Sequence, residues 1–435
     1  MRKIQDICVG FLGCGTVGTG VLRLLRKNNA RCRQLGFRFL VKRIAVKNRR
    51  KKRGLKIASR LFTTDPWSVV RDPKIQIVVE VMGGTGLARE LVLEALRQGK
   101  HVVTANKALL SEHGDEIFAA AKRAGRVVLF EASVCAGVPV IRAIRDGLAA
   151  DQVTALFGIV NGTANYILSM MTEQGWSYAK ALANAQRLGF AEADPILDVG
   201  GGDAAHKLAV LVRVAFGMSI SERHITTEGI SGVEPADLAW AKEFGFRIKM
   251  LAIARDHGGM IEVRVHPALV PLDSSLASVG GALNALEVEG RALGRSFYSG
   301  LGAGSLPTGV GVVADMMQVA QHLAAGSSGY LPSVSDSPRP RSILNMGRVK
   351  TRYYLRLSVA DKLGVLAPVT AVFAKHGISI AEFRQKLSRK SGHATLVFLT
   401  HRAREEDVQS ARGKIDTRKF TLKPMQLFRI EDDKQ

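Results

Sequence analysis

Three glycines at the spacing Gly-x-Gly-x-x-Gly, namely Gly13, Gly15 and Gly18, form the first pattern in the chain that predicts a chemical task. They follow a strand-like apolar run, residues 7–12, and precede a helical pattern of valine and leucines. In this setting the first glycine makes a tight turn, the second lets the backbone approach a pyrophosphate, and the third lets helix and strand pack closely. The N-terminus of the helix then faces the phosphates. The pattern therefore predicts a dinucleotide-binding site.

A run of cations follows the second strand-like segment. Sites that prefer NAD place an acid there to bind the ribose 2′-hydroxyl, whereas this chain has Asn48 followed by five lysines and arginines. Arginine binds a 2′-phosphate bidentately, so Arg49 and Arg50 predict a preference for NADP. A solvated loop and a nucleic-acid patch are the alternatives, because the spacing from the glycines is longer than usual. The lack of interleaved aromatic residues disfavours nucleic acid.

The composition indicates a globular protein of two or three domains. The chain has 435 residues, 46% hydrophobic and 23% charged, and a formal net charge of +24. The basic excess is concentrated near the N-terminus, where residues 1–60 hold 18 lysines and arginines and a single acid, Asp6. Four cysteines without metal-ligand spacing predict neither a disulfide framework nor a zinc site, and indicate a reducing, cytoplasmic location. No membrane span is expected.

Strands alternate with helices in the first third of the chain, which predicts a parallel sheet. In such sheets the chemistry lies outside the carboxyl ends of the strands, where Gly83, Gly84 and Lys107 fall. The strand-like runs are residues 39–46, 75–81, 101–104 and 127–131.

Seven motifs in order across about residues 5–325 make the chain resemble the homoserine dehydrogenases. The motifs are GFLGCGTVG, EVMGG, HVVTANKALL, FEASVCAGVPVI, GIVNGTANYILSMM, LGFAEADPILDVGGGDAAHKLAVL and GLGAGSLPTGVGVVADM. Cys135 and Ala136, and Gly309 to Gly311, differ slightly from the usual family pattern. The resemblance implies NAD(P)-dependent interconversion of L-aspartate 4-semialdehyde and L-homoserine, in the biosynthesis of threonine, methionine and isoleucine.

The resemblance assigns roles to an acidic and basic segment. It implies that Lys207 donates and accepts the proton, that Glu192 and Asp203 hold the substrate's amino and hydroxyl groups, and that Lys107 is a second lysine near the reacting oxygen and the nicotinamide. Asp203 and Lys207 are four residues apart, so they share one face of a helix. An exposed helical ion pair is the alternative for this pair.

The resemblance also implies cofactor and cation ligands. A monovalent cation such as sodium would be bound by the Glu131 side chain and by carbonyls of the loop that follows, and a rigid turn is the alternative for this loop. The cofactor residues are Gly13, Gly15, Thr16, Val17, Gly18, Arg49, Arg50, Gly84, Lys107, Gly189 and Gly304. The cation ligands are Glu131, Val134, Ala136 and Val138.

Residues 326–349 are rich in glycine, serine and proline and are interpreted as a linker. Residues 350–430 follow a βαββαβ pattern that resembles an ACT domain, and Asp361, Gly364 and Val365 match the loop that binds an amino-acid effector, with threonine the leading candidate. A module serving only dimerisation is the alternative. Because all proposed reacting groups precede the linker, a chain ending near residue 330 is expected to keep turnover.

The expected fold class is α/β with three parts. They are a Rossmann-type dinucleotide-binding domain at residues 1–140 completed by a helix near 308–323, an α/β catalytic and dimerisation domain at 141–307, and a C-terminal ferredoxin-like ACT domain. A homodimer or homotetramer is expected. Two rival functions are an acylating semialdehyde dehydrogenase with Cys135 as nucleophile and a nucleic-acid-binding protein that uses the basic N-terminal region.

Overall fold

The structure is a computed structural model that describes residues 4–326, 341–388 and 392–432. Residues 327–340 of the predicted linker lie outside the described residues. The chain forms two compact units, and the predicted 141–307 segment is divided between them. The first unit contains residues 1–162, 202–225 and 282–340, and the second contains 163–201, 226–281 and 341–435.

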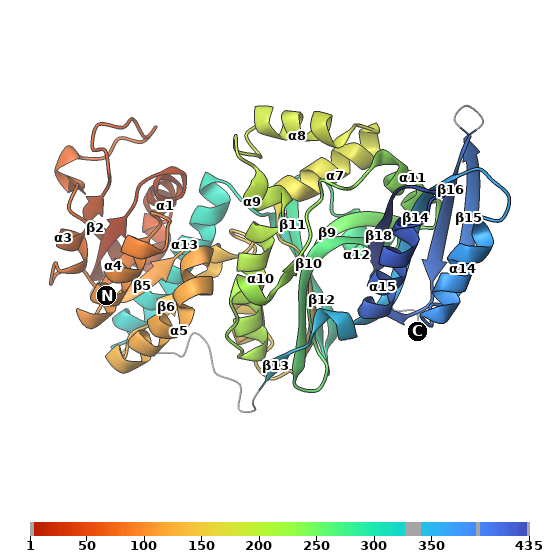
Figure 1. The fold of residues 1–435 in the computed structure, drawn as a ribbon. Helices are drawn as coiled ribbons and strands as arrows, with labels where there is room; N and C mark the ends of the chain where they lie inside the picture. Colours follow the sequence, from red (N-terminus) through yellow and green to blue (C-terminus); the bar gives the residue numbers. More distant parts are fainter. Residues whose placement is uncertain (1–3, 327–340, 389–391, 433–435) are drawn as a thin grey trace. The chain divides into compact units, whose positions relative to one another are not determined.

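A six-stranded parallel sheet forms the N-terminal part of the first unit, drawn in red to orange in Figure 1. Its strand order is β3-β2-β1-β4-β5-β6, in which the first strand along the chain is central and the order reverses beside it. This is the doubly wound order, which places ligands at the carboxyl ends of the strands on either side of the reversal. The strands are β1 (Gln5–Leu12), β2 (Phe37–Ala45), β3 (Phe62–Thr63), β4 (Ile77–Glu80), β5 (His101–Thr104) and β6 (Val128–Leu129).

Helices cover both faces of this sheet because successive residues of each strand point to opposite sides. Val79 and Val103 belong to the core on the side of α1 and α13, whereas Val78 and Val102 belong to the core on the side of α4 and α5. The helices are α1 (Thr16–Lys27), α2 (Asn29–Gln34), α3 (Trp67–Val70), α4 (Gly86–Arg97), α5 (Lys107–Ala124) and α13 (Ser305–Ala324).

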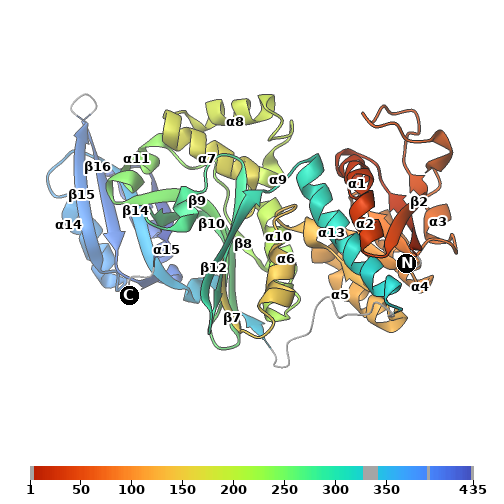
Figure 2. The ribbon, with the colours of Figure 1, turned by 180° about the vertical axis from the view of Figure 1, so that it is seen from behind.

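The late helix α13 packs directly on α1, although nearly 300 residues separate them (Figure 2). Gly20 permits this contact, since a Cβ atom there would lie 1.9 Å from the backbone oxygen of Ser305. Val312 and Met316 of α13 are fully buried in the same core as Val21. The Rossmann-type layer is thus completed by a segment from near residue 310.

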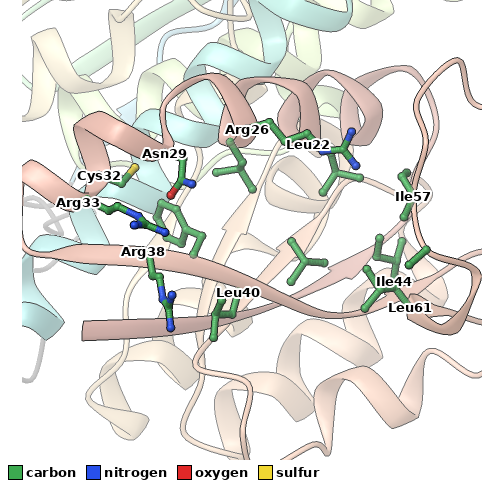
Figure 3. A pocket seen from close by; sticks show the side chains of 14 residues that line it. Leu22, Arg26, Asn29, Cys32, Arg33, Arg38, Leu40, Ile44, Ile57 and Leu61 are labelled. Carbon is green, nitrogen blue, oxygen red and sulfur yellow. The ribbon is translucent and has the colours of Figure 1, made fainter. Parts of the chain in front are cut away.

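A hollow of about 400 Å³ lies between α1, α2 and β2 (Figure 3). Apolar side chains such as Leu22, Leu40 and Ile44 line it together with Cys32 and Arg26. Within the described part of the chain, none of the sequence-predicted site residues is among its lining residues.

The remainder of the first unit is a three-stranded antiparallel group in the order β12-β11-β7, together with α10 (Gly202–Phe216). Helix α10 packs on α5, and Arg213 of α10 pairs with Asp115 of α5. Among the helices in the described ranges, none combines the length and apolar character that crossing a bilayer requires. The strands are β7 (Val153–Ile159), β11 (Leu283–Gly290) and β12 (Gly294–Leu301), and the short turns are η2 (Glu131–Ser133), α6 (Val140–Arg142), η3 (Ala143–Gly147) and η4 (Glu222–His224).

The second unit is built on a mixed sheet in the order β9-β10-β18-β14-β16-β15. Residues 350–430 form the expected βαββαβ module around a core that includes Tyr353, Phe373 and Phe398. The elements of this module are β14 (Lys350–Ala360), α14 (Leu366–Lys375), β15 (Ile380–Ser388), β16 (His393–Thr400), β17 (Ala403–Arg404), α15 (Glu405–Asp416) and β18 (Thr421–Ile430). The other elements are α7 (Gly162–Gln174), α8 (Tyr178–Arg187), α9 (Ile196–Val199), β8 (Thr226–Thr227), α11 (Pro235–Glu243), β9 (Phe246–Asp256), β10 (Met260–Pro271), α12 (Ser275–Ser278), β13 (Ser342–Ile343) and η5 (Met346–Arg348).

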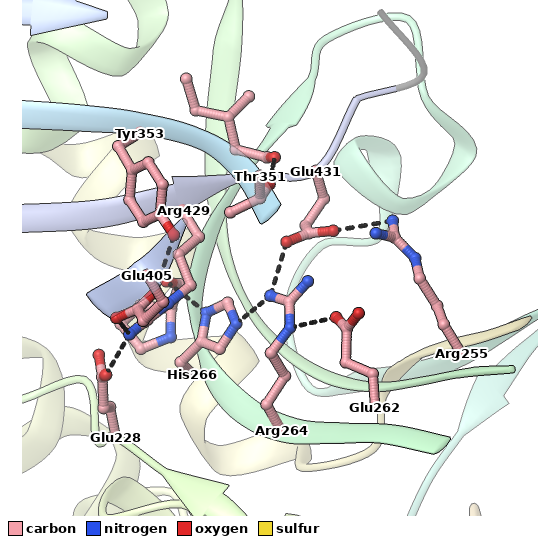
Figure 4. A network of polar contacts seen from close by, with 12 residues as sticks. Glu228, Arg255, Glu262, Arg264, His266, Thr351, Tyr353, Glu405, Arg429 and Glu431 are labelled. Atoms are coloured by element: carbon pink, nitrogen blue, oxygen red, sulfur yellow. Dashed lines mark hydrogen bonds and ion pairs between the residues drawn. The ribbon is translucent and has the colours of Figure 1, made fainter. Parts of the chain in front are cut away.

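A buried network of charges joins the βαββαβ module to β10 within the second unit (Figure 4). Arg264 of β10 is fully buried and pairs with Glu262 at 2.6 Å and with Glu431, just after β18, at 2.7 Å. Burial opposes the charge of Arg264, but the two carboxylates outweigh this effect and raise its pKa. Strands β10 and β18 also pair in parallel at Ala268 and Leu269.

A second buried arginine, Arg429 of β18, extends the network. It binds Glu405 of α15 at 2.6 Å and Glu228, just after β8, at 2.7 Å. Tyr353 donates its hydroxyl to the same Glu405 carboxylate at 2.9 Å. The module is therefore attached to the rest of its unit by paired charges as well as by strand pairing.

Candidate active site

One carboxylate lies between two lysines in the first unit. Asp203 is in the first turn of α10, and its Oδ2 accepts a hydrogen bond from Lys207 Nζ at 2.7 Å. Its Oδ1 lies 3.1 Å from the Nζ atom of Lys107, the first residue of α5. Asn161 donates its side-chain amide to Oδ2 at 2.8 Å. The structure thus brings together residues from three segments that are far apart in the sequence.

The two lysines make Asp203 an ionised group despite its burial. Burial alone would raise the pKa of this carboxyl, but the charges of Lys207 and Lys107 and the hydrogen bonds outweigh burial and hold the pKa well below its ordinary value. The side chain of Lys207 is 11% exposed and that of Lys107 is 34% exposed. The cluster is a buried anion that fixes one enclosed and one accessible ammonium group.

Lys207 has a second acceptor besides Asp203. Its Nζ donates to the backbone carbonyl of Val160, just after β7, at 2.6 Å. The same carbonyl accepts a hydrogen bond from the side chain of Asn284 on β11 at 3.0 Å. Sequence reasoning did not identify Asn284, because it lies outside every motif and 77 residues beyond Lys207.

Glu80 organises the carboxyl ends of the central strands. One of its oxygens accepts from the backbone N–H groups of Met82 and Gly83, and the other accepts from the Thr104 hydroxyl at 2.6 Å. Burial raises the pKa of Glu80, although these hydrogen bonds act in the opposite direction. In the sequence, the signal that could have identified this residue is an acid that ends an apolar strand-like run.

Asn106 links the same loops to Lys107. Its side-chain oxygen caps α5 by accepting from the backbone of Leu109, while its amide donates to the Gly84 carbonyl at 2.8 Å. The strand-end loops therefore set the backbone position of Lys107, whereas Asp203 holds its ammonium group.

The glycine loop has the geometry that a dinucleotide needs. Gly13 has φ of 104°, and a Cβ there would lie 2.6 Å from the Val81 carbonyl oxygen. Gly15 faces open space, and a Cβ at Gly18 would lie 2.9 Å from the carbonyl oxygen of Gly13. Thr16 and Val17 begin α1, whose first N–H groups follow this turn directly. The residues present therefore fit a bound pyrophosphate.

A third arginine, Arg53, contacts the glycine loop more closely than the two predicted cations. Its Nε donates to the Cys14 carbonyl at 3.0 Å, and its guanidinium lies 4.7 Å from the centre of the Phe62 ring. The Arg49 side chain donates to the Ser59 carbonyl at 3.5 Å, and Arg50 donates its backbone N–H to the Asn48 side chain. Sequence reasoning overlooked Arg53, whose approach depends on how residues 47–62 fold back.

Glu192 and Gly189 belong to the second unit, whereas the lysines belong to the first. Glu192 is exposed, and its backbone carbonyl accepts from Gln186 at 3.2 Å. Gly189 ends the α8 segment with φ of 76°, and Gly304 precedes α13 with φ of 117°. Their roles toward cofactor and substrate stay predictions.

The strand expected at residues 127–131, just before the predicted cation loop, is shorter in the structure. The strand ends at Leu129, and Glu131 starts a short turn. Both Glu131 carboxylate oxygens accept backbone N–H groups, from Ile141 and Arg142, each at 2.9 Å. The carboxylate thus caps α6.

The carbonyl oxygens of this loop are partly available to a hard cation. Val138 accepts from the Val140 N–H at 2.8 Å, whereas no donor within the described ranges reaches the carbonyls of Val134 and Ala136. Cys135 and Ala136 have φ of 53° and 56°, so the chain turns sharply here. Of the four predicted cation ligands, Val134 and Ala136 thus offer carbonyl oxygens of the kind a hard cation prefers, whereas Glu131 and Val138 already accept backbone N–H groups.

Cys135 has none of the features of an activated nucleophile. It is buried, and burial raises the pKa of its thiol to about 11. An attacking cysteine requires the opposite change. The geometry disfavours acyl transfer through this residue.

The predicted effector loop borders a hollow of about 400 Å³ in the second unit. Asp361, Gly364 and Val365 line it together with Gln385 and Leu396 of the facing strands. Gly364 has φ of 81°, a conformation that favours glycine.

Comparison with known proteins covers nearly the whole chain. Three family models match, described as homoserine dehydrogenase, NAD binding domain at residues 13–131, homoserine dehydrogenase at 139–317, and ACT domain at 353–418. Homoserine dehydrogenase of Pseudomonas aeruginosa is 41% identical over 433 residues, covering 98% of this chain and 99% of that protein. The homoserine dehydrogenase of Neisseria gonorrhoeae is 39% identical with the same coverage.

A solved structure agrees with the sequence matches. The crystal structure of a homoserine dehydrogenase from Thiobacillus denitrificans has a TM-score of 0.91 and 43% identity, and covers 99% of this chain and 100% of that chain.

Proposed function

The chain belongs to the homoserine dehydrogenase family and is an NAD(P)-dependent oxidoreductase with a C-terminal ACT domain; on this premise we propose how its residues perform and regulate the reaction. The observation that supports the proposal best is the Lys107–Asp203–Lys207 cluster, in which one buried anion holds two ammonium groups. Lysine suits proton transfer to and from a hydroxyl, and a buried counter-charge fixes its position.

In the proposed mechanism Lys207 Nζ takes the hydroxyl proton during homoserine oxidation and returns it during reduction of the semialdehyde. The nicotinamide, when bound, accepts or supplies the hydride. Lys107 stabilises negative charge on the reacting oxygen, since its ammonium is accessible and anchored by Asp203. Glu192 binds the substrate's ammonium group and Asp203 orients the substrate's hydroxyl.

An absorbance assay at the reduced-nicotinamide band, with homoserine and each cofactor, tests the activity. Lys207→Met should lower kcat by about 10²–10⁴ with little change in cofactor affinity. Glu192→Gln should raise KM for homoserine, because it weakens the contact with the ammonium. Near-normal turnover of Lys207→Met would remove this lysine from the mechanism.

We propose that the enzyme prefers NADP and that Arg53 holds the cationic loop against the glycine loop while Arg49 and Arg50 bind the 2′-phosphate. Replacing Arg49 and Arg50 together by alanine should weaken NADP more than NAD, since only NADP carries that phosphate. An equal loss of affinity for NADP and NAD would mean that these arginines act only through the general positive charge of the surface.

We propose that a monovalent cation binds the carbonyls of Val134 and Ala136, with Glu131 and Val138 completing the site. Activity and the thermal midpoint of unfolding are measured in sodium chloride and in the chloride salt of a large organic cation, at equal ionic strength. A lower thermal midpoint without sodium is expected, and identical midpoints would support the rigid-turn alternative.

We propose that the ACT domain binds threonine at the Asp361–Val365 loop and inhibits the enzyme, in a homodimer or homotetramer that serves amino-acid biosynthesis. Threonine should inhibit the intact chain, with a coupling of roughly 5–150-fold in affinity. Asp361→Ala should weaken this response by removing a polar contact. If no amino acid binds, the domain serves only oligomer assembly. Light scattering of the intact enzyme measures its oligomeric state. The cytoplasmic location stays a prediction.

A further inference from the structure

The backbone carbonyl of Val160 is shared by two donors, the ammonium of Lys207 at 2.6 Å and the side-chain amide of Asn284 at 3.0 Å. Asn284 is fully buried on β11. A carbonyl can only accept hydrogen bonds, so the amide nitrogen of Asn284 must face it. The orientation of this amide is therefore fixed by the same atom that binds the lysine.

The surrounding backbone is shaped around the amide. A Cβ at Gly302 would lie 2.0 Å from Asn284 Cγ, so only glycine fits at that position. The amide nitrogen also lies 3.7 Å from Cys135 Sγ. Its oxygen, Oδ1, is buried and has no partner within the described part of the chain, which is unfavourable for folding. Because this unpaired oxygen costs stability, we look for the role of Asn284 in the contact that its amide makes with Val160.

Sharing the carbonyl has an electrostatic consequence for Lys207. A carbonyl that binds an ammonium favours the charged form of that lysine. A second donor on the same oxygen reduces the negative potential available to the lysine and places a partial positive charge beside it. Asp203 favours the charged form of Lys207, while Lys107 beyond it opposes that form, and the buried thiol of Cys135 is also close enough to interact.

We propose that Asn284 is a positioning residue of the reaction, whose amide holds the Val160 carbonyl in place and, by sharing it, eases proton release from Lys207. This inference rests on the proposed role of Lys207 as the proton acceptor. Asn284 itself touches neither substrate nor cofactor in this proposal.

The test measures single-turnover oxidation of homoserine against pH, because that rate requires neutral Lys207 and rises as the lysine loses its proton. Asn284→Leu and Asn284→Ala should both move the midpoint to higher pH by about half a unit to one unit, the worth of one hydrogen bond. Below the midpoint the rate should fall about three- to tenfold, while KM for homoserine stays within about twofold.

The two substitutions separate positioning from packing. Leucine has the branched outline of asparagine without its polar atoms and alanine leaves a cavity, so leucine would restore more of a packing role than alanine, whereas neither would restore the proposed role. Asn165→Ala is the matched control, because this buried asparagine also donates to a carbonyl, that of Val279, away from the lysine cluster. It should lower stability without moving the midpoint.

An unchanged midpoint in Asn284→Leu would overturn the proposal, and so would an equal shift in Asn165→Ala. If Asn284→Ala does not fold, the leucine variant alone decides. Full turnover of Lys207→Met would instead overturn the proposed function, so the two failures are distinguishable.

Discussion

Asp203 should matter more for stability than either lysine that it binds. Asp203→Asn removes the only charge between two ammonium groups, whose nitrogens lie 2.7 and 3.1 Å from its oxygens. With an effective dielectric constant of about 20, each contact is worth about 5–6 kcal/mol of attraction before solvation is considered. Hydration regained by the one-third exposed Lys107 offsets part of the loss. The net cost should be about 3–5 kcal/mol, the usual result of leaving a buried charge without its partner.

Lys207→Met should cost less, about 1–2 kcal/mol, because Asp203 keeps Lys107 and the amide of Asn161. Urea unfolding at neutral pH and fixed ionic strength, with hydrogen exchange of the α5 and α10 peptides, measures both effects. Asp115→Asn is the control: Asp115 also joins these helices through Arg213, but it is 70% exposed, so its loss should cost at most about 1 kcal/mol. If Lys207→Met destabilised the protein as much as Asp203→Asn, Asp203 would not be the shared counter-charge of the site.

Three further outcomes are expected. Gly20→Ala should lower the thermal midpoint by several degrees, because its Cβ would meet the Ser305 backbone, and calorimetry measures this; an unchanged midpoint would contradict the close packing of α1 and α13. Burial would raise the pKa of Glu262, but Arg264 and other partners lower it to about 2. Glu262 therefore stabilises the fold fully at pH values above about 4.5, and this contribution is lost as the pH falls toward 2. In Glu262→Gln the free energy of unfolding should fall less steeply over that pH range. Arg53→Met should weaken NADPH binding in a fluorescence titration, and an affinity equal to that of the unmodified chain would separate Arg53 from the cofactor loop.

The central strands of the first sheet could be predicted because β4 and β5 are buried on both faces and give continuous apolar runs. Two edge segments were exceptions: β3 (Phe62–Thr63) was not predicted, and the strand expected at residues 127–131 is shorter than its apolar run. The latter strand is only two residues long, since Glu131 turns to cap α6 with both carboxylate oxygens. The sequence pattern alone does not show that Glu131, which follows the apolar run, caps a later helix.

The site was predictable where its residues belong to motifs and unpredictable where they depend on tertiary folding. Asp203 and Lys207 share a helical face by spacing alone, and the family resemblance added Lys107. Arg53 reaches the Cys14 carbonyl only because residues 47–62 fold back onto the glycine loop. Asn284 reaches Val160 across two antiparallel strands, a register that no local pattern specifies.

The buried pair between Arg264 and Glu431 limits how this protein could have gained or lost its last hundred residues. A chain ending near residue 330 would leave Arg264 with Glu262 but without Glu431, and would leave β10 without its pairing to β18. Breaking a buried pair typically costs about 3–5 kcal/mol, so we expect this fragment to be less stable than the intact chain, while its turnover stays a prediction. The βαββαβ module is therefore part of the folding unit of β10, although in the sequence it follows as a separate domain.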